Sequence, residues 1–181
     1  KDECFSIMWQ GIISTKYLNS TLIEKYIENL SRKNINICNK IMNNPALTME
    51  MVLAYPELQW KYDSVSSKYM NINDILDHPE LKWDWDYISL NLSVTMDIVL
   101  SNIDKPWNWS WLSRHLNITM ADIESHMDLP WDWINGVSYN PNVTMSMIET
   151  HNDKEWNWLG ISQCMKLIVD ILRQYPDKPW D

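Results

Sequence analysis

The chain has 181 residues and a net charge of −9, with 45% hydrophobic and 22% charged residues. This balance is typical of a folded domain and not of a disordered chain. The sequence holds no cluster of Lys and Arg, which disfavours nucleic-acid and anionic-membrane partners because both require positive charge. The acidic charge is compatible with a basic protein partner. The longest apolar run, residues 164–172, is interrupted by Lys166 and Asp170 and is too short to span a bilayer.

A tandem repeat organises the sequence. In residues 1–44 the repeat is degenerate, with Trp9 lying 12 positions before Thr21. In residues 45–160 it is clear, because each repeat carries an aromatic pair separated by one residue, and the leading tryptophans lie 23, 24, 24 and 25 positions apart. The pairs are Trp60-Lys61-Tyr62, Trp83-Asp84-Trp85, Trp107-Asn108-Trp109, Trp131-Asp132-Trp133 and Trp156-Asn157-Trp158. The last repeat is incomplete at residue 181, so we expect a fragment of a longer protein.

A polar residue flanked by apolar ones lies 12 positions before each leading tryptophan. These residues are predicted helix N-caps: Thr48, Asn71, Thr95, Thr119 and Thr144. The apolar residue before each cap is matched by another five positions later, which is the spacing of a hydrophobic staple. The staple pairs are Leu47/Val52, Met70/Ile75, Val94/Val99, Ile118/Ile123 and Val143/Ile148. Thr21-x-x-Glu24 and Thr119-x-x-Asp122 also have the spacing of a capping box.

Each repeat is predicted to form two short helices. In the repeat that starts at Val94, the Thr95 hydroxyl accepts the cap hydrogen bond and the first helix ends near Asn102. After a turn, the second helix runs from Trp107 to about Leu116. Helices this short are marginal alone, so neighbouring repeats must stack. We therefore predict an all-α fold, an α-solenoid of about seven helix-turn-helix repeats of roughly 24 residues, with residues 1–181 forming a single array.

The tryptophans are predicted to form the structural core, because one large ring per helix fills the space that several leucines fill elsewhere. This set contains Trp60, Trp83, Trp85, Trp107, Trp109, Trp131, Trp133, Trp156, Trp158 and Trp180. Stacking of these rings on nucleobases or sugars is the alternative, which the fixed spacing and acidic charge disfavour. Trp111 lies outside both aromatic columns and is expected to be the most exposed ring.

No catalytic, metal-binding or cofactor-binding residues are predicted, and the protein is not expected to be an enzyme. His78, His126 and His151 share one column seven residues after the cap, but equivalent positions in stacked repeats lie about 8–10 Å apart, too far to share one ion. They are interpreted as residues that end the first helix. The cysteines, Cys4, Cys38 and Cys164, are distant in sequence and odd in number, so reduced thiols of an intracellular protein are expected. The Asn-x-Ser/Thr sequons follow from the repeat and are not counted as glycosylation sites.

The repeat Asn-Pro-Asn-Val-Thr-Met, Asp-Lys-Pro-Trp-Asn-Trp and Ile-Ser resembles tryptophan-rich repeats of proteins encoded by giant DNA viruses. The resemblance implies a viral protein in the host cytoplasm, the viral factory or the virion, and it implies no functional residues. We expect a non-catalytic protein-binding scaffold; the alternatives are a structural virion component and the targeting arm of a multidomain enzyme or ubiquitin-ligase adaptor. Solenoids bind through variable surface positions. The candidate partner-binding residues are Glu50, Asn73, Asp97, Trp111, Ala121, Ser146 and Asp170.

Overall fold

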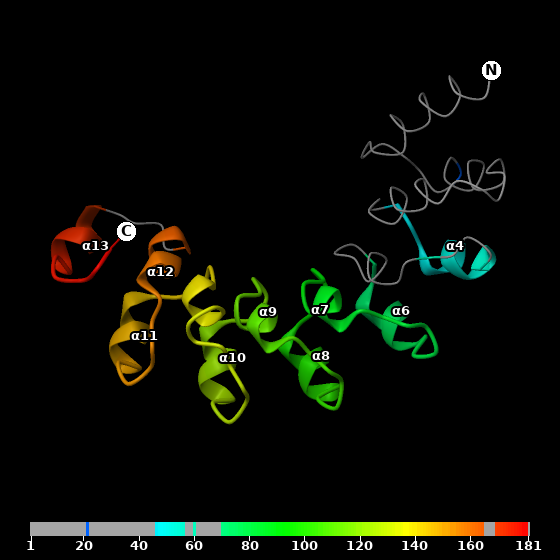
Figure 1. Ribbon diagram of the computed structural model, residues 1–181, viewed down its shortest axis with the longest axis horizontal. Helices are drawn as coiled ribbons and strands as arrows, with labels where there is room; N and C mark the ends of the chain where they lie inside the picture. Colours follow the sequence, from blue (N-terminus) through cyan, green and yellow to red (C-terminus); the bar gives the residue numbers. More distant parts are fainter. Residues whose placement is uncertain (1–20, 22–45, 57–59, 61–69, 165–168, 181) are drawn as a thin grey trace, which may run out of the picture. The chain divides into compact units, whose positions relative to one another are not determined.

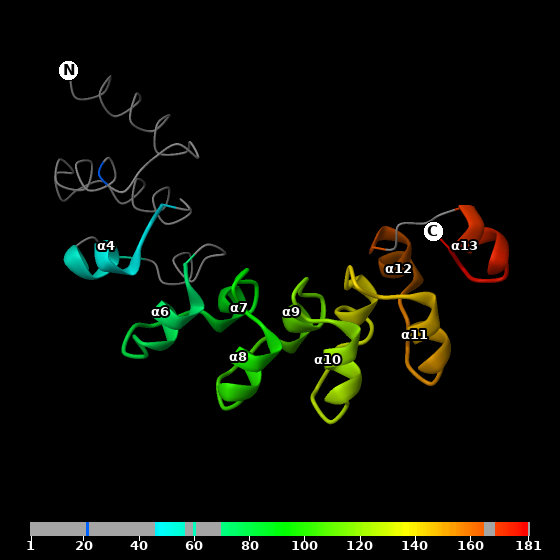
Figure 2. The ribbon, with the colours of Figure 1, turned by 180° about the vertical axis from the view of Figure 1, so that it is seen from behind.

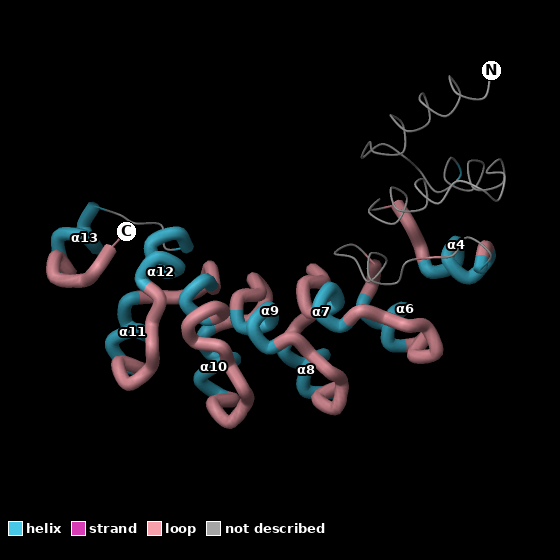
Figure 3. Tube along the Cα trace, in the orientation of Figure 1, coloured by secondary structure: helices cyan, strands magenta, loops and turns pink. Residues whose placement is uncertain are grey.

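The computed structural model describes residues 21, 46–56, 60, 70–164 and 169–180. In these ranges the only regular secondary structure is helical, which confirms the predicted all-α class (Figure 3). The protein divides into two compact units, Lys1–Ser93 and Val94–Asp181. The second unit starts one residue before the cap Thr95, where one repeat gives way to the next. No helix in the described ranges has the length and apolarity needed to cross a membrane.

The helices are short. The described part of the first unit contains α4 (Met49–Ala54), α6 (Ile72–Leu76) and α7 (Trp85–Ile88). The second contains α8 (Met96–Ser101), α9 (Trp109–Ser113), α10 (Met120–Ser125), the 3-10 turn η2 (Val137–Tyr139), α11 (Met145–Thr150), α12 (Trp158–Cys164) and α13 (Val169–Gln174). Within this second unit, α8, α10 and α11 lie along one row and α9 and α12 along another (Figures 1 and 2).

The first helix of each repeat begins directly after its predicted cap. The cap side chains of Thr48, Asn71, Thr119 and Thr144 accept hydrogen bonds from backbone N–H groups in the first turn. Thr119 and Asp122 form a complete capping box. Thr95 occupies the N-cap position of α8, but its hydroxyl makes no cap hydrogen bond, so that detail of the prediction is wrong. Thr21-x-x-Glu24 lies largely outside the described residues.

The second helix starts two residues later than predicted. It begins at the second aromatic of the pair, as α9 does at Trp109 and not at Trp107. The residue between the aromatics is the N-cap: Asn108 accepts from the Trp111 N–H, and Asp84 accepts from the Asp86 N–H. Asn and Asp are strong N-cap residues because their short side chains reach unpaired first-turn N–H groups. The leading tryptophan therefore belongs to the turn, and α9 ends at Ser113, before the predicted Leu116.

One repeat has no α-helix in this second position. Seven positions separate Trp133 from Asn140, whereas six separate the corresponding residues of the two preceding repeats. The Val137 N–H donates to the Asp132 carbonyl over 2.7 Å, and the Ser138 N–H donates to the Trp133 carbonyl over 3.1 Å. Both bonds reach five residues back, the pattern by which a helical turn absorbs one inserted residue. The insertion thus replaces the predicted helix by turns and η2.

Two glycines allow close contact between successive repeats. A Cβ on Gly136 would overlap the Ser113 side chain and lie 2.6 Å from the Asp132 carbonyl oxygen. A Cβ on Gly160, in α12, would lie 2.7–2.9 Å from the Tyr139 ring. Any larger residue would push the neighbouring repeat away at both positions.

The staple residues form the core. All five predicted pairs are buried, and Val94, Val99, Ile118 and Ile123 are fully inaccessible. Towards the C-terminus, Val143, Met145, Ile148 and Ile161 form one cluster. Partly buried hydrophobic residues pack against this cluster: Trp156 and Trp158 of the same repeat, Met120 of the preceding one, and Ile171, Tyr175 and Trp180 of the following one. Neighbouring repeats therefore complete the core of each repeat.

Every leading tryptophan makes the same hydrogen bond. Its indole N–H donates to the backbone carbonyl five residues earlier, at the C-terminus of the first helix. Carbonyls at a helix C-terminus lack partners within the helix, so the indole caps this end of the helix. The bonds run from Trp60 to Tyr55 (2.9 Å), Trp83 to His78 (2.7 Å), Trp107 to Asn102 (2.8 Å), Trp131 to His126 (2.8 Å), Trp156 to His151 (2.9 Å) and Trp180 to Tyr175 (2.8 Å).

The second tryptophan of one repeat packs against the leading tryptophan of the next. In the second unit these rings meet edge to face, a geometry that places the positive ring edge over the negative ring face. The pairs are Trp109–Trp131 (5.2 Å, 86°), Trp133–Trp156 (5.2 Å, 86°) and Trp158–Trp180 (5.0 Å, 90°). One aromatic column therefore closes the turn within a repeat, and the other joins successive repeats.

Trp107→Ala should lower the free energy of unfolding by about 3–5 kcal/mol, because it removes a buried ring and leaves the Asn102 carbonyl with the Lys105 N–H as its remaining donor. Urea denaturation of the whole protein measures this loss. Met127→Ala is the matched control: Met127 is 38% exposed, and its truncation should change stability by no more than about 0.5 kcal/mol. Equal effects of the two substitutions would contradict the core role of Trp107.

Candidate interaction surface

The first helices of the second unit, α8, α10 and α11, expose equivalent positions to solvent. We call the face made by helix positions two, five and six after the cap, together with the loop that follows, the outward face. Its exposed residues are Asp97, Leu100, Ser101, Ile103 and Asp104; Ala121, Glu124, Ser125, Met127 and Asp128; and Ser146, Glu149, Thr150, Asn152 and Asp153. Helix positions three and four apart lie on one side of a helix, so each set projects together.

The outward face is acidic and partly apolar. It contains six carboxylates and no Lys or Arg, whereas Leu100, Ile103 and Met127 are 37%, 48% and 38% exposed. The nearest lysines contact the edge of the face: Lys105 pairs with Asp104 over 3.2 Å, and Lys154 pairs with Asp153 over 3.1 Å. The hydrogen bond from Lys154 lowers the pKa of Asp153. A face of this kind is complementary to a basic surface with apolar side chains.

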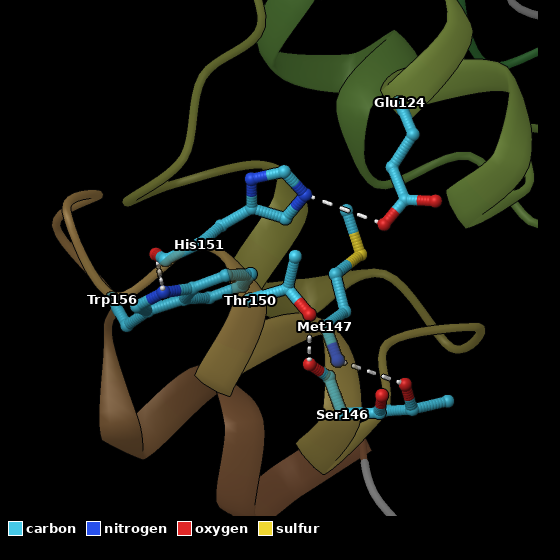
Figure 4. A network of polar contacts seen from close by, with 7 residues as sticks. Glu124, Ser146, Met147, Thr150, His151 and Trp156 are labelled. Carbon is cyan, nitrogen blue, oxygen red and sulfur yellow. Dashed lines mark hydrogen bonds and ion pairs between the residues drawn. The ribbon is translucent and has the colours of Figure 1, made fainter.

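Part of the outward face also links successive repeats. His151 Nε2 lies 3.3 Å from a Glu124 carboxylate oxygen of the preceding repeat (Figure 4). The His151 ring also lies 5.6 Å from the Trp133 ring, and the His151 carbonyl accepts the Trp156 indole N–H. In the next repeat, burial and a hydrogen bond with Glu149 raise the pKa of Tyr175. In both cases, the glutamate five residues after the cap position of one repeat contacts the residue that lies seven positions after the cap position of the next repeat.

The structure gives the candidate partner-binding residues different environments. Glu50, Asn73, Asp97, Ala121 and Ser146 are all exposed at the second position of their helices. The Asp170 side chain lies outside the described residues. Trp111 is half-buried, like most of the other tryptophans, and packs against Arg114.

The core tryptophans fall into two groups by exposure. Trp60, Trp107 and Trp131 are buried, at 6%, 5% and 7% exposure. The other members of the predicted set are half-buried: Trp83, Trp85, Trp109, Trp133, Trp156, Trp158 and Trp180. The half-buried set contains the second ring of each pair and also three leading rings, Trp83, Trp156 and Trp180.

The histidine column marks the end of the first helix. His126 and His151 are the C-cap residues of α10 and α11, and His78 follows the C-cap of α6. Their carbonyls, and not their rings, perform the recurring task of accepting the indole N–H. Within the described ranges, no three His, Cys, Asp or Glu side chains are grouped to hold a metal ion. Cys164 is a free thiol, whereas Cys4 and Cys38 lie outside the described residues.

Buried asparagines form a second set of links that sequence reasoning missed. Asn140 is fully buried, and its amide nitrogen donates to the carbonyls of Ser113 (2.9 Å) and Ile118 (3.0 Å) in the preceding repeat. Asn91 is likewise buried and donates to the Met70 carbonyl over 2.6 Å. Ile118 and Met70 are staple residues. The visible signal was the recurrence of Asn two and four residues before the cap, which was interpreted only as repeat consensus and as sequons.

Serines in the second helix complete the links between repeats. The Ser113 hydroxyl donates to the Trp109 carbonyl over 2.6 Å and accepts the Asp132 N–H of the next repeat over 3.0 Å. Ser138 repeats both contacts, accepting from the Asn157 N–H over 2.9 Å. The donors and the acceptors of these hydrogen bonds both lie inside the protein. The bonds therefore stabilise the packing of successive repeats and do not contact a binding partner.

The protein matches no known family model, no curated protein and no solved structure. Ser113, Ser138 and Asn140 form hydrogen bonds between successive repeats, whereas the residues two positions after each cap are exposed.

Asn140→Ala should reduce the free energy of unfolding by about 1–3 kcal/mol, because it removes the amide donor of the Ser113 carbonyl and leaves the Ile118 carbonyl with the Asn142 amide alone. Thermal or urea unfolding of the intact protein measures this. Asn152→Ala, at an exposed loop position, is the control and should stay within about 0.5 kcal/mol of the parent. If Asn140→Ala unfolds like the control, the buried amide does not join the repeats.

Proposed function

We propose that the protein is an α-solenoid of about seven repeats of roughly 24 residues, and that it acts as a non-catalytic protein-binding scaffold. The recurrence of the same contacts at this period supports the stacked array. In the second unit, each edge-to-face tryptophan pair, each serine bond and each asparagine bond joins one repeat to its neighbour.

The main support for a binding role comes from the position two residues after each cap. The residue two positions after the cap is exposed in every first helix whose side chains the structure describes, and it changes from Asp97 to Ala121 to Ser146 along the second unit. The residues that hold the stack recur in most repeats, with His115 at the position of the buried Asn91 and Asn140, so they can be kept while the exposed position varies. A constant core beneath a varied surface is the arrangement by which solenoids recognise partners.

The composition of the outward face favours a basic, amphipathic protein segment as the binding partner. Six carboxylates would attract Lys and Arg side chains, and Leu100, Ile103 and Met127 would contact apolar ones. Charges at the rim of an interface mainly steer association and select partners, while buried apolar contacts supply most of the affinity. The partner is therefore expected to carry both features on one side.

Selection from a random peptide library displayed on phage, with the full protein as bait, tests this proposal. The recovered peptides should be basic with spaced apolar residues, and Asp128→Lys should weaken their binding by about tenfold because it reverses a charge on the outward face. Asp86→Lys changes the net charge equally but lies at the start of α7, outside the outward face. It should leave affinity within about twofold. Peptides without basic residues, or equal losses for both variants, would contradict the proposal.

A further inference from the structure

Arg114 lies over two aromatic rings, whereas Lys154 and Lys178 each lie over one. It is the C-cap residue of α9 and is half-buried. Its guanidinium carbon lies 4.8 Å from the centre of the Trp111 ring and 5.2 Å from the centre of the Tyr139 ring. Trp111 lies one helical turn earlier, whereas Tyr139 belongs to the next repeat, so the guanidinium bridges two repeats. Aromatic contacts of this kind hold a guanidinium in place without using its N–H donors.

The Tyr139 ring is itself held on several sides. Gly160 leaves space for it, because any larger residue there would collide with the ring. The Asn157 amide donates to the Tyr139 hydroxyl over 3.4 Å, and the Cys164 thiol donates to the Tyr139 carbonyl over 2.9 Å. The platform on which Arg114 rests is therefore fixed before any ligand arrives, and a pre-formed site loses less entropy on binding.

The charge of Arg114 has no carboxylate partner among the described residues. No hydrogen bond or ion pair from its guanidinium to a described residue is formed, although the group carries five N–H donors. The nearby Cys164 thiol supplies no negative charge, because burial raises its pKa, an effect that the Arg114 charge only partly offsets. Two aromatic rings thus hold a cation whose donors bond to no residue in the described part of the chain.

The geometry points to a carboxylate-binding site on Arg114, with Trp111 and Tyr139 as its walls, which takes a carboxylate of a protein partner. A planar guanidinium matches a carboxylate through two parallel hydrogen bonds. The site offers one positive charge, which suits a monoanion better than a doubly charged phosphate. The carboxylate could be the C-terminus of the partner or one of its Asp or Glu side chains. This site is separate from the outward face, and neither proposal depends on the other.

The test follows the guanidinium directly. The sequence has three arginines, Arg32, Arg114 and Arg173, so the Nε–Hε NMR spectrum of arginine-labelled protein is simple, and Arg114→Lys assigns the signal of Arg114. N-acetylglycine is the probe for a terminal carboxylate, and N-acetylaspartate N-methylamide is the probe for the carboxylate of an Asp or Glu residue. At least one should move the Arg114 signal saturably, with a midpoint on the order of 1–10 mM, as expected of a small fragment.

Two controls separate binding from a purely structural role. Trp111→Leu keeps the guanidinium but removes one wall, and it should raise the midpoint about tenfold while the exposed Arg173 signal stays unchanged. Neutral N-acetylglycinamide and sodium chloride should move neither signal. The site is overturned if Arg114 responds no more than Arg173, if the neutral amide gives the same shift, or if inorganic phosphate binds while both carboxylates fail.

Discussion

The hydrogen bond from each leading indole to the carbonyl five residues before it is the constraint on which the rest of the structure depends. A helix of five or six residues cannot satisfy its own last carbonyls, and water would compete for them. The indole N–H fills this role from within the core and fixes the direction in which the backbone leaves the helix. In the second unit, Trp131, Trp156 and Trp180 also form an edge-to-face pair with a tryptophan of the preceding repeat. One residue type therefore ends the first helix, closes the turn and forms the junction.

Local signals predicted the fold well where they act through neighbouring residues. Thr119 with Asp122, and staple pairs such as Val94 and Val99, depend only on residues within one turn of helix. The predicted start of the second helix was wrong because it was placed at the apolar Trp107. The next residue, Asn108, is of a type that favours the N-cap position, and it is the N-cap in the structure. Residues 133–139 lack the second α-helix because this repeat contains one inserted residue. The insertion is visible in the sequence as a spacing of 25 between Trp131 and Trp156, but its effect on the backbone is not.

The contacts between repeats were less predictable, because their partners lie 19 to 27 residues apart. Asn140 and Ser113 are polar residues in places that a pattern of apolar periodicity assigns to the surface. Their burial becomes understandable only when the preceding repeat supplies carbonyl and N–H partners. Trp111 was expected in solvent for a similar reason: nothing local to α9 indicates that Tyr139 of the next repeat lies against Arg114, which covers Trp111.

This division of labour links the fold to function. Tryptophan, asparagine and serine hold the repeats through contacts that are satisfied inside the protein, and so they leave the exposed position two residues after each cap free to vary. Positions such as Ala121 and Ser146 can change without altering the stack. A short repeat with few core positions therefore gains an exposed helix position in each repeat, which a protein partner can contact.

Hydrogen exchange of tryptophan indole N–H groups tests the central constraint most directly, because a donor bonded in the core exchanges only when its repeat opens. In protein labelled at the indole nitrogen, we predict slow exchange for the leading rings Trp60, Trp83, Trp107, Trp131, Trp156 and Trp180. Faster exchange is expected for Trp109, Trp133 and Trp158, whose indole N–H groups donate to no described residue. Equal exchange rates for the two sets would show that the indole bonds do not hold the helix ends.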